Sequence, residues 1–188
     1  MTNSLSFCLF QTSKLETNKM KHLFTFLSFT IMTNTVLAQN GKATTEKTTF
    51  HRETSVSIEI DADPAIVWVL LTNASDYPRW NSTVTSIDGN IALGEKIKLK
   101  SILDAKRTFK LKVKEFEPEK KLVWGDGQGK RVYTILKNGN GTLSFSMTER
   151  IGGLMFPLYA KMIPPFDESF EQFAKDLKKE SEIIQNSK

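Results

Sequence analysis

Cysteine and histidine are almost absent from this sequence. Its 188 residues include one cysteine, Cys8, and two histidines, His22 and His51. One cysteine cannot form a disulfide within the chain, and no cluster of thiols is available to hold a metal ion. A catalytic triad or metal site built on histidine is also excluded, because only His51 follows the predicted cleavage site described below. We therefore expect neither a metal ion nor a cofactor, and we assign no catalytic residue.

Long hydrophobic runs are absent as well. The apolar stretch 23–32 has about ten residues and includes Ser and Thr, whereas a membrane-spanning helix needs ~20. Lys19 and Lys21 precede this stretch, and the small-residue exit Val36-Leu37-Ala38 follows it. A basic start, a short apolar run and such an exit are typical of a secretory signal peptide.

Residues 1–38 are therefore expected to be a signal peptide that is cleaved after Ala38. The mature protein would then be periplasmic or secreted, and a retained membrane anchor is the alternative interpretation. Met20 is a second candidate start. Initiation there would make residues 1–19 an extension that does not belong to the protein.

The excess of positive charge is small. The chain has 26 Lys and Arg residues against 21 Asp and Glu residues, a formal net charge of +5. Lys14, Lys19 and Lys21 lie in the predicted signal peptide against a single acid, Glu16, so the excess in the mature chain is smaller still. Such a balance is too weak to indicate nucleic-acid binding, and we expect no nucleic-acid partner.

The segment after the cleavage site is polar. It lacks hydrophobic periodicity, so we expect residues 39–53 to be a flexible lead-in. From Thr54 apolar and polar residues alternate, which predicts a half-buried strand. Asp63 and Pro64 then predict the start of a helix, with Asp63 as the N-cap and Pro64 at the first helical position. A second short helix is expected over residues 77–81.

The rest of the chain consists of short strands and one long helix. Glycine and asparagine turns separate the predicted strands 83–88, 95–103, 108–116, 122–124, 130–137 and 142–150. Apolar residues at spacings of three and four predict an amphipathic helix over 165–186. The predicted fold is α+β, a single domain over residues 54–186. In it a curved antiparallel sheet of about seven strands wraps around the C-terminal helix and leaves a hollow, with two short helices after the first strand.

Opposed residues in a hairpin indicate which side chains share a face. Centring the first hairpin at Ala105 sets Leu99 opposite Leu111 and Ile97 opposite Val113. It also gathers six lysines on the other face, namely Lys96, Lys98, Lys100, Lys110, Lys112 and Lys114. These lysines form either a solvated outer face or a contact with an anionic membrane surface.

The hairpin centred at Asn140 places charge on the apolar face. It sets Tyr133 opposite Met147 and Arg131 opposite Glu149. If the apolar members face the hollow, Arg131 and Glu149 do too, and we expect them to form a charge-assisted pair. That pair is either a polar anchor for a ligand carboxylate or hydroxyl, or a structural salt bridge.

Several short motifs carry a resemblance to a known family. They are Ile60-Asp61-Ala62-Asp63-Pro64, Tyr77-Pro78-Arg79-Trp80-Asn81, Leu122-Val123-Trp124-Gly125 and Glu149-Arg150-Ile151-Gly152-Gly153. In this order they resemble the START-like superfamily (SRPBCC), in its polyketide cyclase/dehydrase and lipid transport branch, over about residues 54–185. The resemblance implies a helix-grip fold with a pocket for hydrophobic ligands. Related members often have histidine where Arg131 stands, and this departure removes any chemistry that depends on an imidazole there.

Aromatic and apolar residues facing the hollow are the candidate ligand contacts. Trp124 and Tyr133, on neighbouring strands, are the preferred pair, although aromatic residues also build ordinary cores. The candidate ligand-binding residues are Trp68, Trp80, Phe109, Leu111, Trp124, Arg131, Tyr133, Phe145, Met147, Glu149, Phe156, Phe170 and Phe173. The apolar connector 154–163, before the last helix, is either a loop packed on the core or a pocket mouth that touches a membrane.

These observations favour a binding or carrier protein for an apolar or amphipathic, lipid-like small molecule. We expect a monomer with weak membrane-surface contact. The alternative is a cyclase- or aromatase-like enzyme that uses the same pocket, with Tyr133, Arg131 or Glu149 as acid or base. A third possibility is an interaction module without a ligand, which a filled interior would indicate.

Overall fold

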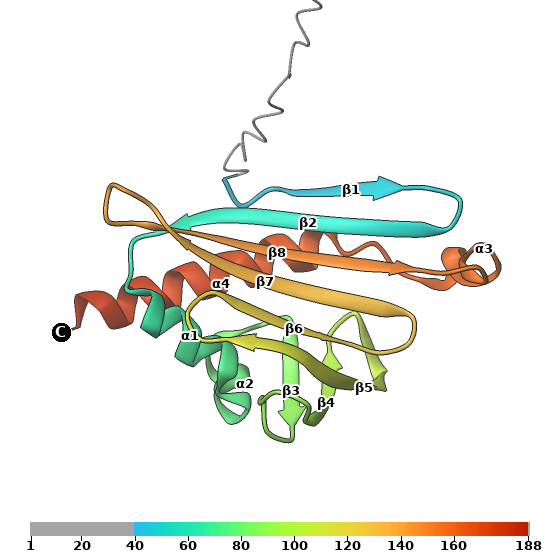
Figure 1. The fold of residues 1–188 in the computed structure, drawn as a ribbon, viewed down its shortest axis with the longest axis horizontal. Helices are drawn as coiled ribbons and strands as arrows, with labels where there is room; N and C mark the ends of the chain where they lie inside the picture. Colours follow the sequence, from blue (N-terminus) through green and yellow to red (C-terminus); the bar gives the residue numbers. More distant parts are fainter. Residues whose placement is uncertain (1–39, 188) are drawn as a thin grey trace, which may run out of the picture. The chain divides into compact units, whose positions relative to one another are not determined.

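One antiparallel sheet of eight strands dominates the part of the chain that the computed structural model describes, residues 40–187 (Figure 1). The elements are β1 (Ala43–Lys47), β2 (His51–Ile60), α1 (Pro64–Thr72), η1 (Ala74–Asp76), α2 (Tyr77–Trp80), β3 (Val84–Asp88), β4 (Lys96–Ser101), β5 (Asp104–Glu117), β6 (Lys121–Gly125), β7 (Gly129–Lys137), β8 (Leu143–Gly152), α3 (Phe156–Tyr159), η2 (Ala160–Met162) and α4 (Asp167–Asn186). The strand order is β1-β2-β8-β7-β6-β5-β4-β3. The predicted α+β class with a long C-terminal helix is confirmed, and the predicted signal peptide lies outside the described residues.

The strand that the sequence analysis missed is β1, so the prediction of a flexible lead-in was wrong for most of residues 39–53. β1 pairs antiparallel with β2, whose first residues also fall in this segment. Thr45 Oγ1 lies 2.8 Å from Thr54 Oγ1 and 2.8 Å from Asp167 Oδ1, which ties β1 to both β2 and α4. β1 carries no hydrophobic alternation because it is an edge strand that stays largely polar.

The predicted helix start at Asp63 and Pro64 is confirmed. Asp63 Oδ1 accepts a hydrogen bond from the backbone N–H of Ala65 at 2.8 Å and so caps α1. The backbone N–H of Asp63 donates in turn to Gln185 Oε1 near the end of α4, at 3.2 Å. The start of α1 therefore lies beside the C-terminal end of α4 (Figure 1), whereas α2 meets the middle of α4, where Arg79 pairs with Glu180.

The C-terminal helix packs directly on one part of the sheet. α4 contacts mainly β2, with further contacts to β1, β8 and α1. The predicted apolar stripe is buried at Phe170, Phe173 and Leu177. The Phe173 ring centroid lies 5.8 Å from that of Tyr133 and 6.4 Å from that of Phe145. Side chains thus fill the space between α4 and the strands beneath it.

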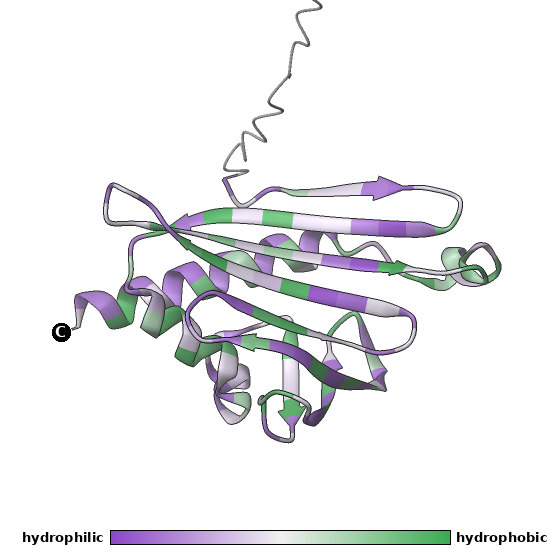
Figure 2. Cartoon of the chain, viewed as in Figure 1, coloured by the Kyte–Doolittle hydropathy of each residue, from purple (hydrophilic) through white to green (hydrophobic). Residues whose placement is uncertain are grey.

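Alternating residues separate an inner, apolar face of the sheet from an outer, polar one, as Figure 2 shows along β2 and β7. The predicted register of β7 and β8 is confirmed, with Tyr133 opposite Met147 and Arg131 opposite Glu149. The predicted register of β4 and β5 was wrong by two residues, since Leu99 lies opposite Phe109. The turn lies at residues 102–103, and the register shifts between Leu99 and Ser101. A shift of two preserves the faces, and all six lysines are exposed.

Gly125 at the end of β6 tests how tightly the strand ends are packed. A Cβ placed there would lie 2.2 Å from the carbonyl oxygen of Gly129, whereas one on Gly127 would meet nothing within 4 Å. We expect Gly125→Ala to lower the free energy of unfolding by about 1–3 kcal/mol, because backbone must move. Gly127→Ala is the matched control and should leave it unchanged or raise it by up to about 1 kcal/mol. Chemical denaturation of both variants checks this, and equal effects would contradict it.

Candidate functional site

A cavity of about 430 Å³ lies on the inner face of the sheet, away from the body of α4. Its sheet wall comes from β4 to β8 and includes Leu99, Phe109, Leu111, Trp124, Arg131, Glu149 and Ile151. Its other wall is the segment that joins β8 to α4, residues 153–166, which is called the connector from here on. This segment lines the cavity through Tyr159, Met162, Ile163, Pro164 and Phe166. Mostly apolar walls with a few polar groups are the usual composition of a small-molecule site.

The connector is held in place by Arg52 of β2. The Nη1 and Nη2 atoms of Arg52 donate to the carbonyl oxygens of Ile163 at 3.2 Å and Pro164 at 2.7 Å. The Arg52 guanidinium also stacks 4.6 Å from the centroid of the Phe166 ring. Burial lowers the pKa of Arg52, although the carboxylates of Asp167 and Glu149 oppose this. Arg52 is thus a buried cation that fixes one wall of the cavity.

Arg131 and Glu149 form the predicted ion pair, and both line the cavity. Nε of Arg131 donates a hydrogen bond to Glu149 Oε2, and Nη2 forms an ion pair with the same oxygen. The two side chains are 17% exposed, and the Arg131 guanidinium lies 5.1 Å from the centroid of the Phe170 ring. Burial alone would lower the pKa of Arg131, but the interactions with Glu149 and Tyr133 together outweigh it and the pKa is raised. Arg131 therefore stays charged.

Tyr133 lies behind the cavity wall instead of within it. Its ring packs edge-to-face on Trp124, with centroids 5.0 Å apart, and its side chain is buried. Among the described residues no partner with hydrogen-bond geometry satisfies the Tyr133 hydroxyl, although Arg131 is its neighbour. Burial raises the pKa of Tyr133 to about 12, against the opposing effect of the Arg131 charge.

The structure divides the sequence-predicted ligand contacts into two groups. Phe109, Leu111, Trp124, Arg131 and Glu149 line the cavity. The others do not line the cavity and pack in the core or against the connector. They are Trp68, Trp80, Tyr133, Phe145, Met147, Phe156, Phe170 and Phe173. The prediction placed the ligand between the sheet and the C-terminal helix, but the cavity lies between the sheet and the connector. The difference arises because Phe173 and its neighbours pack against the sheet without leaving space.

Some residues of the site were not identified from the sequence. Arg52 fell in the predicted flexible lead-in, but it lies two residues before Thr54 and so shares the inner face with Thr54 and Val56. Extending the alternating pattern toward the N-terminus would have found it. Arg107 is a second cation at the cavity, and its guanidinium lies 4.7 Å from the centroid of the Phe109 ring.

Two negative findings apply to the described part of the chain. Residues 40–187 contain no group of three or more His, Cys, Asp or Glu side chains placed to hold a metal ion. Within the same range, no helix combines the length and the apolar character that crossing a membrane requires.

Comparison with known proteins identifies the family. The model of the family described as polyketide cyclase / dehydrase and lipid transport matches residues 51–182. The chain belongs to this family. The predicted START-like relationship is thereby confirmed, and the cavity described above is the hollow of a polyketide cyclase / dehydrase and lipid transport domain. No curated protein sequence matches the chain.

Solved structures show the same fold at low sequence identity. A START superfamily protein from Mycobacterium smegmatis has 15% identity and a TM-score of 0.52, covering 70% of this chain and 98% of its own. A hypothetical protein from Helicobacter pylori has 16% identity and a TM-score of 0.56, covering 68% and 86%. A conserved protein of unknown function from Enterococcus faecalis has 13% identity and a TM-score of 0.54, covering 74% and 77%. These similarities concern the fold alone.

Replacing Tyr133 tests the cost of its buried hydroxyl. At neutral pH we expect Tyr133→Phe to leave stability unchanged or raise it by about 1 kcal/mol, because an unsatisfied buried hydroxyl is removed. A folded pKa of about 12 against an ordinary value of 10.0 means that the folded state holds the proton more tightly. The wild type should therefore lose about 2–3 kcal/mol relative to the variant as the pH rises from 10 to 12.

The matched control for this substitution is Tyr77→Phe. The Tyr77 hydroxyl donates to the carbonyl oxygen of Leu71 at 2.9 Å, so its removal should cost about 1 kcal/mol at neutral pH. Denaturation curves of the wild type and both variants at neutral and alkaline pH provide the measurement. A clear loss of stability in Tyr133→Phe at neutral pH would show that its hydroxyl has a favourable partner.

Proposed function

We propose that the protein is an exported carrier or binding protein that holds an apolar or amphipathic, lipid-like small molecule in the cavity beneath the connector. The observation that supports this is the cavity itself, about 430 Å³ in volume and walled mainly by apolar and aromatic side chains. This volume falls in the range of small-molecule pockets, about 300–1,000 Å³. The Arg131–Glu149 pair supplies one polar anchor among these walls.

A cyclase-like enzyme is the less favoured reading of the same cavity. Such an enzyme needs a group that gives or takes a proton near neutral pH. Tyr133 lies outside the lining, and its pKa is raised to about 12. Arg131 is held in its charged form by Glu149. The interaction-module alternative requires a filled interior, which the cavity argues against.

A substitution that fills the cavity tests the proposed function. Leu111 lines the cavity, whereas Leu136 is 58% exposed and is absent from the lining. We expect Leu111→Trp to weaken binding of the neutral fluorescent probe N-phenylnaphthylamine by about tenfold or more, because the indole occupies the ligand's space. Leu136→Trp adds the same side chain on the opposite face and should bind the probe like the wild type.

Native mass spectrometry of the protein purified from its own host complements this titration. We expect an apolar molecule to be retained by the wild type and depleted in Leu111→Trp. A wild type that binds no probe and retains no molecule would contradict the proposed function.

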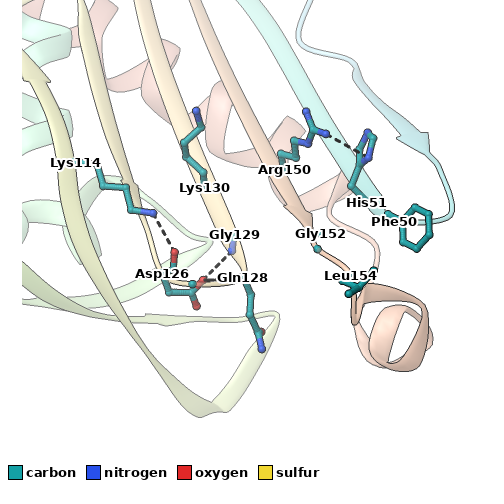
Figure 3. Close-up of a pocket in the computed structure, with 12 residues that line it drawn as sticks. Phe50, His51, Lys114, Asp126, Gln128, Gly129, Lys130, Arg150, Gly152 and Leu154 are labelled. Atoms are coloured by element: carbon teal, nitrogen blue, oxygen red, sulfur yellow. Dashed lines mark hydrogen bonds between the residues drawn. The ribbon is translucent and has the colours of Figure 1, made fainter.

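The connector carries an exposed apolar tip, formed by Leu154, Met155, Leu158 and Met162. These side chains are 83%, 61%, 74% and 81% exposed. Phe50, itself 52% exposed, lies beside Leu154 in the surface pocket of Figure 3, where Lys114, Lys130 and Arg150 also line the wall. An apolar projection flanked by cations matches an anionic lipid surface in both respects. We therefore propose that a monomer touches anionic membranes weakly through this tip, next to the cavity.

Vesicle sedimentation tests the proposed membrane contact. We expect the wild type to bind vesicles that contain phosphatidylglycerol, to bind pure phosphatidylcholine vesicles less, and to dissociate as salt is added. Leu154→Ser/Leu158→Ser should lose most of this binding, because apolar area is removed outside the cavity lining. Leu93→Ser, which removes an apolar side chain that is 66% exposed between β3 and β4, is the control and should bind normally. Unchanged vesicle binding, or a wild-type dimer that the double variant disrupts, would contradict the proposal.

A further inference from the structure

The polar end of the cavity offers an acceptor instead of a free cation. Nε and Nη2 of Arg131 are both directed at Glu149 Oε2. Another part of the guanidinium is close enough to the Tyr133 hydroxyl to lower that group's pKa against the effect of burial. The charge of Arg131 is therefore compensated within the protein by Glu149.

The second oxygen of Glu149 remains available. Within residues 40–187, no hydrogen bond reaches Glu149 Oε1, whereas Oε2 accepts one from Arg131 Nε and is ion-paired with Nη2. Oε1 lies beside Gly129, a residue of the cavity wall, since a Cβ placed on that glycine would be 3.9 Å from it. The Glu149 side chain is 17% exposed in the cavity lining, so a ligand that covers Oε1 removes it from water. A ligand that brings a hydrogen-bond donor then avoids leaving this oxygen unsatisfied.

The other charges of the lining do not supply a buried site for an anion. Arg107 is exposed, so solvent screens its charge. Asp126 Oδ1 accepts the backbone N–H groups of Gln128 and Gly129 at 2.7 and 2.8 Å, and Asp104 is exposed. Arg52 directs its donors at the connector carbonyls and is not part of the lining.

We infer that the cavity selects ligands whose buried polar group is an uncharged hydrogen-bond donor, a hydroxyl, over ligands that end in a carboxylate, with Glu149 Oε1 as the acceptor. This inference rests on the proposed function and names its ligand class. A hydroxyl donates a hydrogen bond to Oε1 and so replaces the water that it displaces, whereas a carboxylate meets a second negative charge and loses its own hydration. Glu149 is thus a specificity-determining residue, and Arg131 is the positioning residue that orients it.

A pair of ligands with the same alkyl chain tests the selection. Dodecanol and dodecanoate are titrated in competition with N-phenylnaphthylamine, at a pH where the acid is ionised. We expect the wild type to bind dodecanol at least about tenfold more tightly than dodecanoate. Equal or tighter binding of dodecanoate would overturn the inference while the proposed function stands. Binding of neither ligand, and of no probe, would instead contradict the proposed function.

Glu149→Gln provides the sharper test, because it neutralises the acceptor and leaves the charge of Arg131 uncompensated. We expect dodecanoate to bind at least about tenfold more tightly than to the wild type, and dodecanol to bind more weakly, so that the preference reverses. Asp104→Asn removes the same charge from an exposed position of the same lining and should leave the preference unchanged. A preference that is the same in Glu149→Gln and the wild type would overturn the role of Glu149.

A second variant covers the case in which Glu149→Gln fails to fold with a buried, unpaired arginine. Arg131→Met/Glu149→Leu replaces the pair with apolar side chains of similar size, an exchange that buried ion pairs often tolerate. Dodecanol should then bind about five- to tenfold more weakly than to the wild type, without a gain for dodecanoate, because its hydroxyl has lost the acceptor. Unchanged dodecanol affinity in this variant would overturn the inference.

Discussion

The packing of Phe173 against the sheet determines which part of the inner face can contain a cavity. This ring contacts those of Tyr77, Trp80, Tyr133 and Phe145, and so it holds α4 over β2 and β8. A helix is about 10 Å wide and strands are about 4.8 Å apart, so one helix covers roughly two strands. The sheet has eight. The inner face from β4 to β7 therefore needs another cover, which α1 and α2 provide at one end and the connector at the other.

The connector covers its part of the sheet without filling it. Its residues Tyr159 to Phe166 stand across the cavity from Trp124 and Leu111, while Arg52 binds its backbone. The Arg131–Glu149 pair lies in the same space and gives a mainly apolar cavity a buried ion pair. The fold thus separates two roles: the aromatic cluster around Phe173 stabilises the domain, and the connector side encloses the cavity in which we propose that a ligand binds.

Local patterns in the sequence predicted those elements that are determined by neighbours along the chain. The Asn140 turn fixed the register of β7 and β8, and with it the Arg131–Glu149 pair. The turn before Asp104 was misplaced because the shift between Leu99 and Ser101 has no signature in hydrophobic alternation. The strand β1 was not predicted because it is stabilised by hydrogen bonds to residues far away in the sequence, Asp167 and Glu171 of α4. The position of the cavity could not be predicted either, since it depends on which aromatic rings meet across the fold.

The attachment of the connector has an implication for how such a protein diversifies. Arg52 donates hydrogen bonds to the backbone carbonyl oxygens of Ile163 and Pro164 and none to their side chains. Every amino acid supplies such a carbonyl oxygen. Substitutions at Tyr159 or Met162 would therefore change the shape of the cavity, while the hydrogen bonds from Arg52 still hold the connector in place. The shape of the cavity, and with it the proposed ligand specificity, could therefore change through a few substitutions in the connector while the packing of the core stays the same.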